Sequence, residues 1–165
     1  MAKQKGAKGR YFLAATGFVL SLTVALPDAG LSTGLSGGSN RGSNASQSLA
    51  EVEARIAAQD FGGAISLLER IVKASPGDAN ALQYLGYSHR ALGDYEAALD
   101  YYLRALAVEP MHVRANEYLG ELHLEMGDVA GAEERLLALT KACAGCAEQI
   151  DLERKIRAYK RNNQS

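Results

Sequence analysis

Two cysteines three residues apart are the first candidates for chemistry in this chain of 165 residues. Cys143 and Cys146 flank an Ala-Gly pair, and the sequence holds no other cysteine. Their spacing suits a disulfide bridge, a thiol-redox pair or half of a four-ligand metal site. A redox pair usually opens a helix in a βαβ fold, and this sequence has no strand pattern. We expect a structural disulfide between Cys143 and Cys146, while the thiol-redox and metal-binding alternatives stay open.

His89 and His123 are the next candidates, because imidazole is a common metal ligand and titrates near neutral pH. As a pair they would form a metal site or a pH-sensitive site. Alternatively, they pack at equivalent positions of a repeated unit. Their separation equals that between Ala64 and Ala98, and this favours packing, because core positions recur with the period of a repeat. We therefore predict no metal ligand in this chain.

No set of residues is typical of catalysis. Serines cluster in a Gly-rich segment, where nothing holds them in a fixed geometry. Four carboxylates recur at helical spacing: Glu117, Glu121, Glu125 and Asp128. Acid–base work by such groups requires an enclosed site that shifts a pKa, and a solvated helix face is the simpler expectation. The sequence therefore predicts a protein that is not an enzyme and has no catalytic residue and no cofactor.

Charge is distributed unevenly along the chain, although its net value is only −1. Within residues 49–142, acidic side chains outnumber basic ones nearly two to one. Nucleic-acid binding requires a basic surface, so we predict no nucleic-acid partner.

The N-terminus carries the pattern of an export signal. Four basic residues up to Arg10 precede an uncharged apolar run from Tyr11 to Leu26. The run is shorter than the roughly 20 apolar residues of a spanning helix, and small residues at 23–25 suit cleavage after Ala25. We predict a signal peptide over 1–26, or an inner-membrane anchor if it is uncleaved, in which case this segment is the only membrane contact. The expected location is the bacterial periplasm or the cell exterior.

The following segment, residues 27–48, is rich in Gly and Ser. This composition buries too little apolar surface to offset the entropy lost on ordering. We predict a flexible linker.

One repeated spacing organises the rest of the chain. It separates Ala64, Ala98 and Ala132, and likewise Asp60, Asp94 and Asp128. A period of this length, about 34 residues, is typical of a helix-turn-helix solenoid whose repeats stack to form one core. Gly93 and Gly127 are expected to end the first helix of their repeats, and the aspartates to cap the second.

The middle block resembles the tetratricopeptide repeat (TPR) through residues at matching positions: Leu82, Leu85, Gly86, His89, Gly93, Tyr95, Ala98, Tyr102, Ala105 and Pro110. The whole chain is also similar to small exported bacterial TPR proteins with a late Cys pair before a final helix. The resemblance implies an all-α fold, a right-handed helix-turn-helix solenoid of three repeats at 45–78, 79–112 and 113–146. A capping helix and tail follow at 147–165, where Leu152, Ile156 and Tyr159 recur at helical spacing.

The resemblance also implies a function, the binding of a protein or peptide partner in a concave groove lined by the first helix of each repeat. The groove positions in this sequence are Asn80, Gln83, Tyr84, Tyr87, Arg90, Arg114, Glu117, Tyr118 and Glu121. Tyr84 and Tyr118 alternatively pack between helices. Chaperone-binding members of the family hold a terminal carboxylate with Lys and Asn. Here the corresponding pairs are Gln83 with Tyr87 and Glu117 with Glu121, so that clamp is absent.

We further expect Tyr87, Arg90, Arg114 and Glu121 to form an exposed aromatic strip with an acidic and a basic end. Two alternative functions compete with partner binding. One is a thiol-redox or metal-binding protein that uses Cys143 and Cys146, and the other is a self-associating structural protein of the cell envelope.

Overall fold

The structure is a computed structural model that describes residues 40–163, with side chains from residue 49 onward. The predicted signal peptide, 1–26, and the linker residues 27–39 lie outside the described residues. The described part contains seven helices and no strand. They are α1 (Asn40–Ala57), α2 (Phe61–Ala74), α3 (Ala79–Ala91), α4 (Tyr95–Val108), α5 (Val113–Glu125), α6 (Val129–Cys143) and α7 (Ala147–Asn163). The predicted all-α fold is confirmed.

The short turns between helices follow from the repeated Gly-Asp and Gln-Asp pairs. In each hairpin, one aspartate caps the second helix. Its side chain accepts a hydrogen bond from the backbone N–H three residues further along the chain. The bonds join Asp60 to Gly63 at 2.9 Å, Asp94 to Ala97 at 3.3 Å and Asp128 to Gly131 at 2.9 Å. Gly93 and Gly127 precede two of these caps with φ of +80° and +81°, a region that residues with a Cβ rarely adopt.

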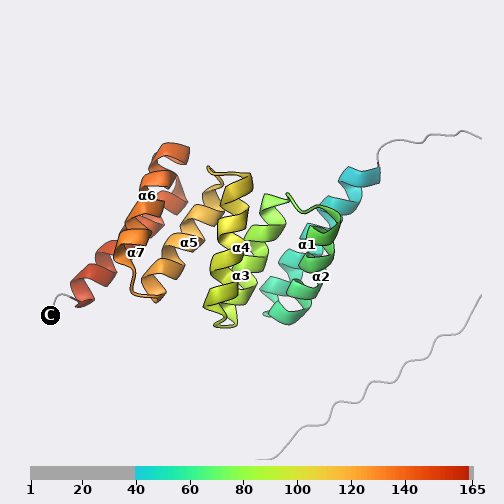
Figure 1. The fold of residues 1–165 in the computed structure, drawn as a ribbon, viewed down its shortest axis with the longest axis horizontal. Helices are drawn as coiled ribbons and strands as arrows, with labels where there is room; N and C mark the ends of the chain where they lie inside the picture. Colours follow the sequence, from blue (N-terminus) through green and yellow to red (C-terminus); the bar gives the residue numbers. More distant parts are fainter. Residues whose placement is uncertain (1–39, 164–165) are drawn as a thin grey trace, which may run out of the picture. The chain divides into compact units, whose positions relative to one another are not determined.

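The helices pair as three antiparallel hairpins, α1–α2, α3–α4 and α5–α6, which stack side by side (Figure 1). The second helix of each hairpin also contacts the first helix of the next, as in α2 with α3 and α4 with α5. The last helix, α7, packs against both α5 and α6. The architecture is the predicted solenoid of helical hairpins.

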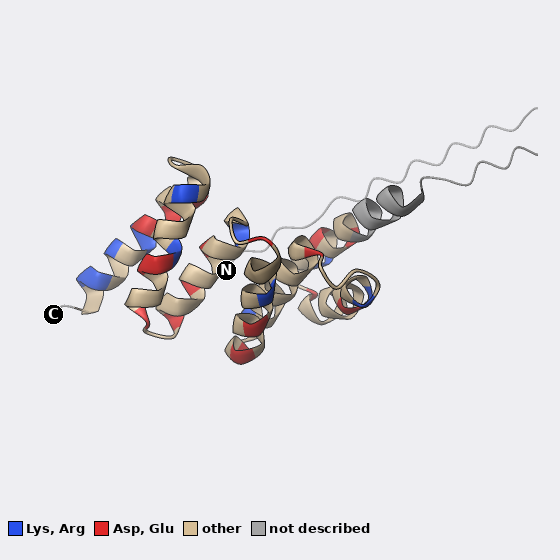
Figure 2. Cartoon of the chain, turned by 45° about the horizontal axis from the view of Figure 1, so that its top comes forward, with Lys and Arg blue, Asp and Glu red and all other residues tan. Residues whose placement is uncertain are grey.

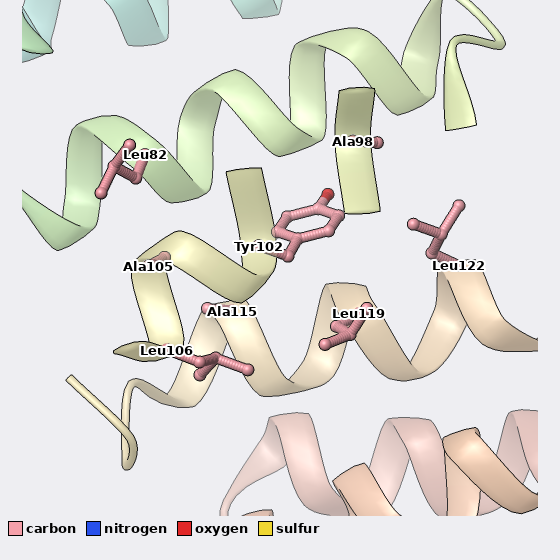
Figure 3. Close-up of a cluster of buried hydrophobic side chains, with 8 residues drawn as sticks. All are labelled: Leu82, Ala98, Tyr102, Ala105, Leu106, Ala115, Leu119 and Leu122. Atoms are coloured by element: carbon pink, nitrogen blue, oxygen red, sulfur yellow. The ribbon is translucent and has the colours of Figure 1, made fainter. Parts of the chain in front are cut away.

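Each hairpin shares its core with the helix that follows it. Val52, Leu68 and Leu85 join α1, α2 and α3 in one buried cluster. A second cluster fills the space between α3, α4 and α5 around Tyr102, which is fully buried (Figure 3). The third joins α5, α6 and α7 through Leu124, Ala132, Leu139, Leu152 and Ile156. Since no hairpin encloses its own core, neighbouring repeats stabilise one another.

Two glycines allow the helices to approach closely. A Cβ at Gly86 of α3 would lie 2.6 Å from ring atoms of Tyr102, and a Cβ at Gly120 of α5 would lie 2.5 Å from Leu152. Ala98 of α4 is completely buried in the middle cluster. Small residues at these positions therefore set the distance between helices.

The first helix begins earlier than the sequence predicts. α1 starts at Asn40, so residues 40–48 are helical in a segment for which the sequence predicts a linker. This stretch contains one glycine and no proline, and adding residues to an existing helix is far easier than nucleating one. The turns around the buried Val52 therefore extend toward the N-terminus. None of the helices in the described part of the chain is long and apolar enough to cross a membrane.

Candidate partner-binding face

Side chains from α1, α3, α5 and α7 meet on one face of the solenoid, which we call the first-helix face. Its cross-helix contacts recur at nearly equal separations in sequence: Glu53 with Tyr84, Tyr87 with Tyr118, Arg90 with Glu121 and Glu121 with Lys155. These contacts connect all four helices into one continuous surface. The capping helix α7 thus also forms part of the face, as the first helix of a fourth repeat would.

One half of the face is aromatic. The Tyr87 ring lies between Phe61, at 6.3 Å between centroids, and Tyr118, at 5.2 Å. Both tyrosines are half-buried. The Tyr84 hydroxyl donates a hydrogen bond of 2.5 Å to Glu53 Oε1. Burial, followed by this contact with Glu53, raises the pKa of Tyr84 to about 12, so the phenol remains a hydrogen-bond donor at neutral pH.

The other half of the face is charged and internally paired. Arg90 donates to Glu121 from one guanidinium nitrogen and to Glu125 from Nε at 3.1 Å. The second oxygen of Glu121 accepts from Lys155, which also lies 2.6 Å from Asp151 Oδ2. Because Glu121 is only 7% exposed, its two cationic partners compensate for the water that it loses. The result is an ionic ladder across α3, α5 and α7.

Glu117 lies beside this ladder but has no comparable partner. Its side chain is buried, and its Oε2 atom has no hydrogen-bond partner. Burial, and then the charge of Glu121, raise the pKa of Glu117. Oxygen atoms of Glu117, Glu121 and Asp151 all lie within 4.8 Å of one another. In the described residues these three form the only cluster with the composition of a metal site, although Lys155 already pairs with two of them.

The remaining predicted residues occupy three different environments. Asn80 is exposed, and its Oδ1 lies 3.1 Å from His112 Nε2. Gln83 is only 3% exposed, and its buried Nε2 lacks a partner. Arg114 donates to the Tyr118 hydroxyl at 3.1 Å and lies 3.8 Å from Glu148 of α7. Of these three residues, Asn80 and Arg114 are therefore accessible, whereas Gln83 belongs to the interior.

The expectation of an exposed strip is wrong for two of its members. Arg90 and Glu121 are largely buried and bound to each other. The physical reason is the alignment of adjacent first helices, in which residues that lie opposite each other are 31 apart in the sequence rather than one full repeat period apart. Arg90 and Glu121, which carry opposite charges, are therefore in contact. Tyr87 and Arg114 are the members that remain available.

Sequence reasoning missed three residues of the face, Glu53, Asp151 and Lys155, and also Phe61 of α2, whose ring packs against Tyr87. Two of them lie in α7, which the sequence presented only as a cap. A separation of 31 residues was a usable signal for Glu53, because the same separation joins Tyr87 to Tyr118 and Arg90 to Glu121. Lys155 lies 34 residues after Glu121.

The histidines predicted at equivalent positions form equivalent contacts. His89 Nδ1 lies 3.1 Å from Asp94 and His123 Nδ1 lies 2.9 Å from Asp128, each at the cap of the following helix. Arg55 holds the same position in the first hairpin and pairs with Asp60 at 2.9 Å. These contacts agree with the packing alternative, because the partner in each case is a residue of the turn.

The two cysteines are bonded to each other in the turn between α6 and α7. Their sulfur atoms lie 2.13 Å apart, and Gly145 between them has φ of +82°. The Gly145 N–H donates to Gln149 Oε1 at 2.7 Å, which ties the turn to the first residues of α7. The bond joins the two ends of this turn and therefore restrains the angle between α6 and α7.

A pocket of about 550 Å³ lies between α4, α5 and α6. Its lining combines apolar residues of α4 and α5 with polar residues near the start of α6: Leu99, Leu103, Leu119, His123, Asp128, Ala130, Gly131, Glu134 and Arg135.

Figure 2 shows Lys and Arg gathered along α7, while Asp and Glu recur on the preceding helices.

Stacked helical hairpins that recur at one fixed spacing define a helical repeat protein. Two overlapping segments, 49–107 and 85–145, match the family model described as tetratricopeptide repeat. Together they span more than half of the chain, and the chain belongs to this family. No curated protein sequence matches it.

Several solved structures share the fold. The type III secretion translocator chaperone SycD of Yersinia enterocolitica is 17% identical, with 77% of this chain and 90% of SycD covered and a TM-score of 0.67. PcrH, solved with the chaperone-binding region of PopD, is 23% identical, with 78% and 98% covered and a TM-score of 0.66. The Sgt2 TPR domain of Aspergillus fumigatus is 23% identical, with 73% and 80% covered and a TM-score of 0.65. These three structures therefore share the fold of this chain.

Proposed function

We propose that this protein binds a peptide or a segment of another protein on its first-helix face and carries out no catalysis. The observation that carries the proposal is the position of Tyr87, a half-buried ring between Phe61 and Tyr118. Tyrosine is enriched at protein interfaces because it buries a large apolar ring and keeps a hydroxyl for a polar contact. Here the neighbouring rings hold it in place before a partner arrives.

Structures with the same fold support this proposal. SycD has been solved with a peptide of YopD, PcrH with the chaperone-binding region of PopD, and the first TPR of Spaghetti (RPAP3) with an HSP90 peptide. In this chain the first-helix face carries Glu117, Glu121 and Glu125 where a terminal carboxylate would need cations. We therefore infer a partner segment that is not acidic.

We further propose that the protein acts outside the cytoplasm of a bacterium. The basic and apolar pattern of residues 1–26 supports export, and a disulfide persists in an oxidising compartment. N-terminal sequencing of protein from the cell envelope should begin near Leu26 or Gly30. Intact Met1 found only in the cytosolic fraction would contradict export.

The binding proposal is tested by comparing two tyrosines on the same protein. Peptides selected from a displayed random library against the wild-type chain are measured again with Tyr87→Ala and with Tyr95→Ala. Tyr95 lies on α4, outside the first-helix face, and is exposed. We expect Tyr87→Ala to weaken binding at least tenfold, because the loss of an aromatic anchor is among the costliest single changes at an interface.

The control variant Tyr95→Ala should change the affinity less than twofold. Circular dichroism of both variants checks that helicity is retained. Equal affinities of the two variants would place recognition elsewhere, and the pocket between α4, α5 and α6 would then be the next surface to test.

A further inference from the structure

One carboxylate on the first-helix face lacks the cation that its neighbours have. Five acidic side chains gather there on α5 and α7: Glu117, Glu121, Glu125, Glu148 and Asp151. Four basic side chains pair with them: Arg90 with Glu121 and Glu125, Arg114 with Glu148, Lys155 with Glu121 and Asp151, and Arg154 with Asp151. Glu117 is the acidic residue left without an ion pair.

Because Glu117 is buried, the lack of an ion pair is energetically unfavourable for its charged form. Glu117 is 7% exposed, and its Oε2 atom has no hydrogen-bond partner. Its carboxylate also faces the oxygens of Glu121 and Asp151 within 4.8 Å. A buried charge without a partner is unfavourable, and a cation placed against it would form a strong charge-assisted hydrogen bond.

We propose that Glu117 accepts a lysine or arginine side chain of the bound partner segment. This inference rests on the proposed function, because it names the chemistry of the segment that binds on the first-helix face. The aromatic half of the face receives the apolar part of the same segment. A basic side chain suits both halves, because its methylene stem packs on apolar surface while its charged end reaches the carboxylate.

A metal ion fits the same three carboxylates less well. Lys155 already pairs with Glu121 and with Asp151, so a divalent cation would have to displace an ammonium group. An incoming basic side chain displaces neither Arg90 nor Lys155 from its carboxylates, and it reaches the buried Oε2 of Glu117 once the side chains that cover this atom move aside. The unpaired acceptor therefore favours a basic side chain.

The test uses two fluorescein-labelled pools of 12-residue peptides that differ in one group. Both pools carry Tyr, Leu and Ala at random positions; one has a central arginine and the other has citrulline, its uncharged analogue. Binding is measured by fluorescence anisotropy with the wild-type chain, with Glu117→Gln and with Glu69→Gln. Glu69 is an exposed glutamate on α2, outside the first-helix face.

We expect the wild-type chain to bind the arginine pool at least tenfold more tightly than the citrulline pool. Glu117→Gln should remove this preference, and Glu69→Gln should keep it. A preference that survives in Glu117→Gln overturns the inference, as does a wild-type chain that binds both pools equally.

Two further outcomes separate this inference from the proposed function. If Tyr87→Ala weakens both pools while Glu117→Gln changes neither, the face binds peptides and Glu117 has no part in selecting them. If neither pool binds the wild-type chain, the inference fails, and the peptides selected from the displayed library decide the proposed function separately. Calorimetric titration with Ca²⁺ and Mn²⁺ completes the test, because metal binding that is lost in Glu117→Gln would make Glu117 a metal ligand instead.

Discussion

At the scale of single residues, equivalent positions of the three repeats carry different side chains that make the same kind of contact. Arg55, His89 and His123 are equivalent, and each pairs with the aspartate that caps the next helix. The aspartate caps were predictable because Gly-Asp turns have a local signature. The pairing partner was not, since it depends on how the end of one helix lies over the start of the next.

Glu117 yields a prediction about stability and pH. Burial and Glu121 raise its pKa in the folded state, so the folded chain holds this carboxylate in charged form less readily than the unfolded chain does. Glu117→Gln should therefore stabilise the protein at neutral pH by about 1 kcal/mol. The gain should shrink as the pH falls through the folded-state pKa, because the wild-type carboxyl then takes up a proton and its penalty disappears.

Urea unfolding at a series of pH values measures this difference directly. The charged groups that surround Glu117 are present in both proteins, and their interactions with the Glu117 charge are part of the measured difference: Arg114 and Glu121 on α5, and Glu148, Asp151 and Lys155 on α7. A variant that is less stable at neutral pH would show that Glu117 contributes a favourable interaction to the unbound protein.

At the scale of elements, the hairpins depend on small residues where helices cross. The period of the repeats predicted the helices and their turns, because each of these has a local or periodic signature. It did not predict the ladder from Arg90 through Glu121 to Lys155. That ladder depends on the rotation between successive repeats, which sets a separation of 31 residues for α3 and α5 and of 34 for α5 and α7.

Ala98 provides the test of this close packing. It is fully buried in the middle cluster together with Tyr102 (Figure 3). Ala98→Leu should lower the free energy of unfolding by about 1–3 kcal/mol, because the added atoms have no space to fill. Ala107→Leu, an exposed position of the same helix, should change it by less than about 0.5 kcal/mol. Equal thermal midpoints for the two variants would show that the contact at Ala98 adapts to a larger side chain.

At the scale of the whole molecule, three clusters connect the described helices in sequence. The first involves α1, α2 and α3, and the third involves α5, α6 and α7. In such an arrangement each unit contacts only its neighbours, so stability is distributed along the solenoid. A destabilising substitution at one end of the solenoid should therefore affect mainly the helices at that end.

Leu152 and Leu68 allow that expectation to be tested with matched changes. Both are fully buried leucines, one in the third cluster and one in the first. Each replacement by alanine should cost about 2–5 kcal/mol through the lost contacts and the cavity left behind. Hydrogen exchange should show faster exchange in α5, α6 and α7 for Leu152→Ala, with α1 and α2 close to wild type. Leu68→Ala should give the reverse pattern. Uniform loss of protection along all helices in both variants would mean that the solenoid opens as one cooperative unit, and the first-helix face would then be lost as a whole rather than from one end.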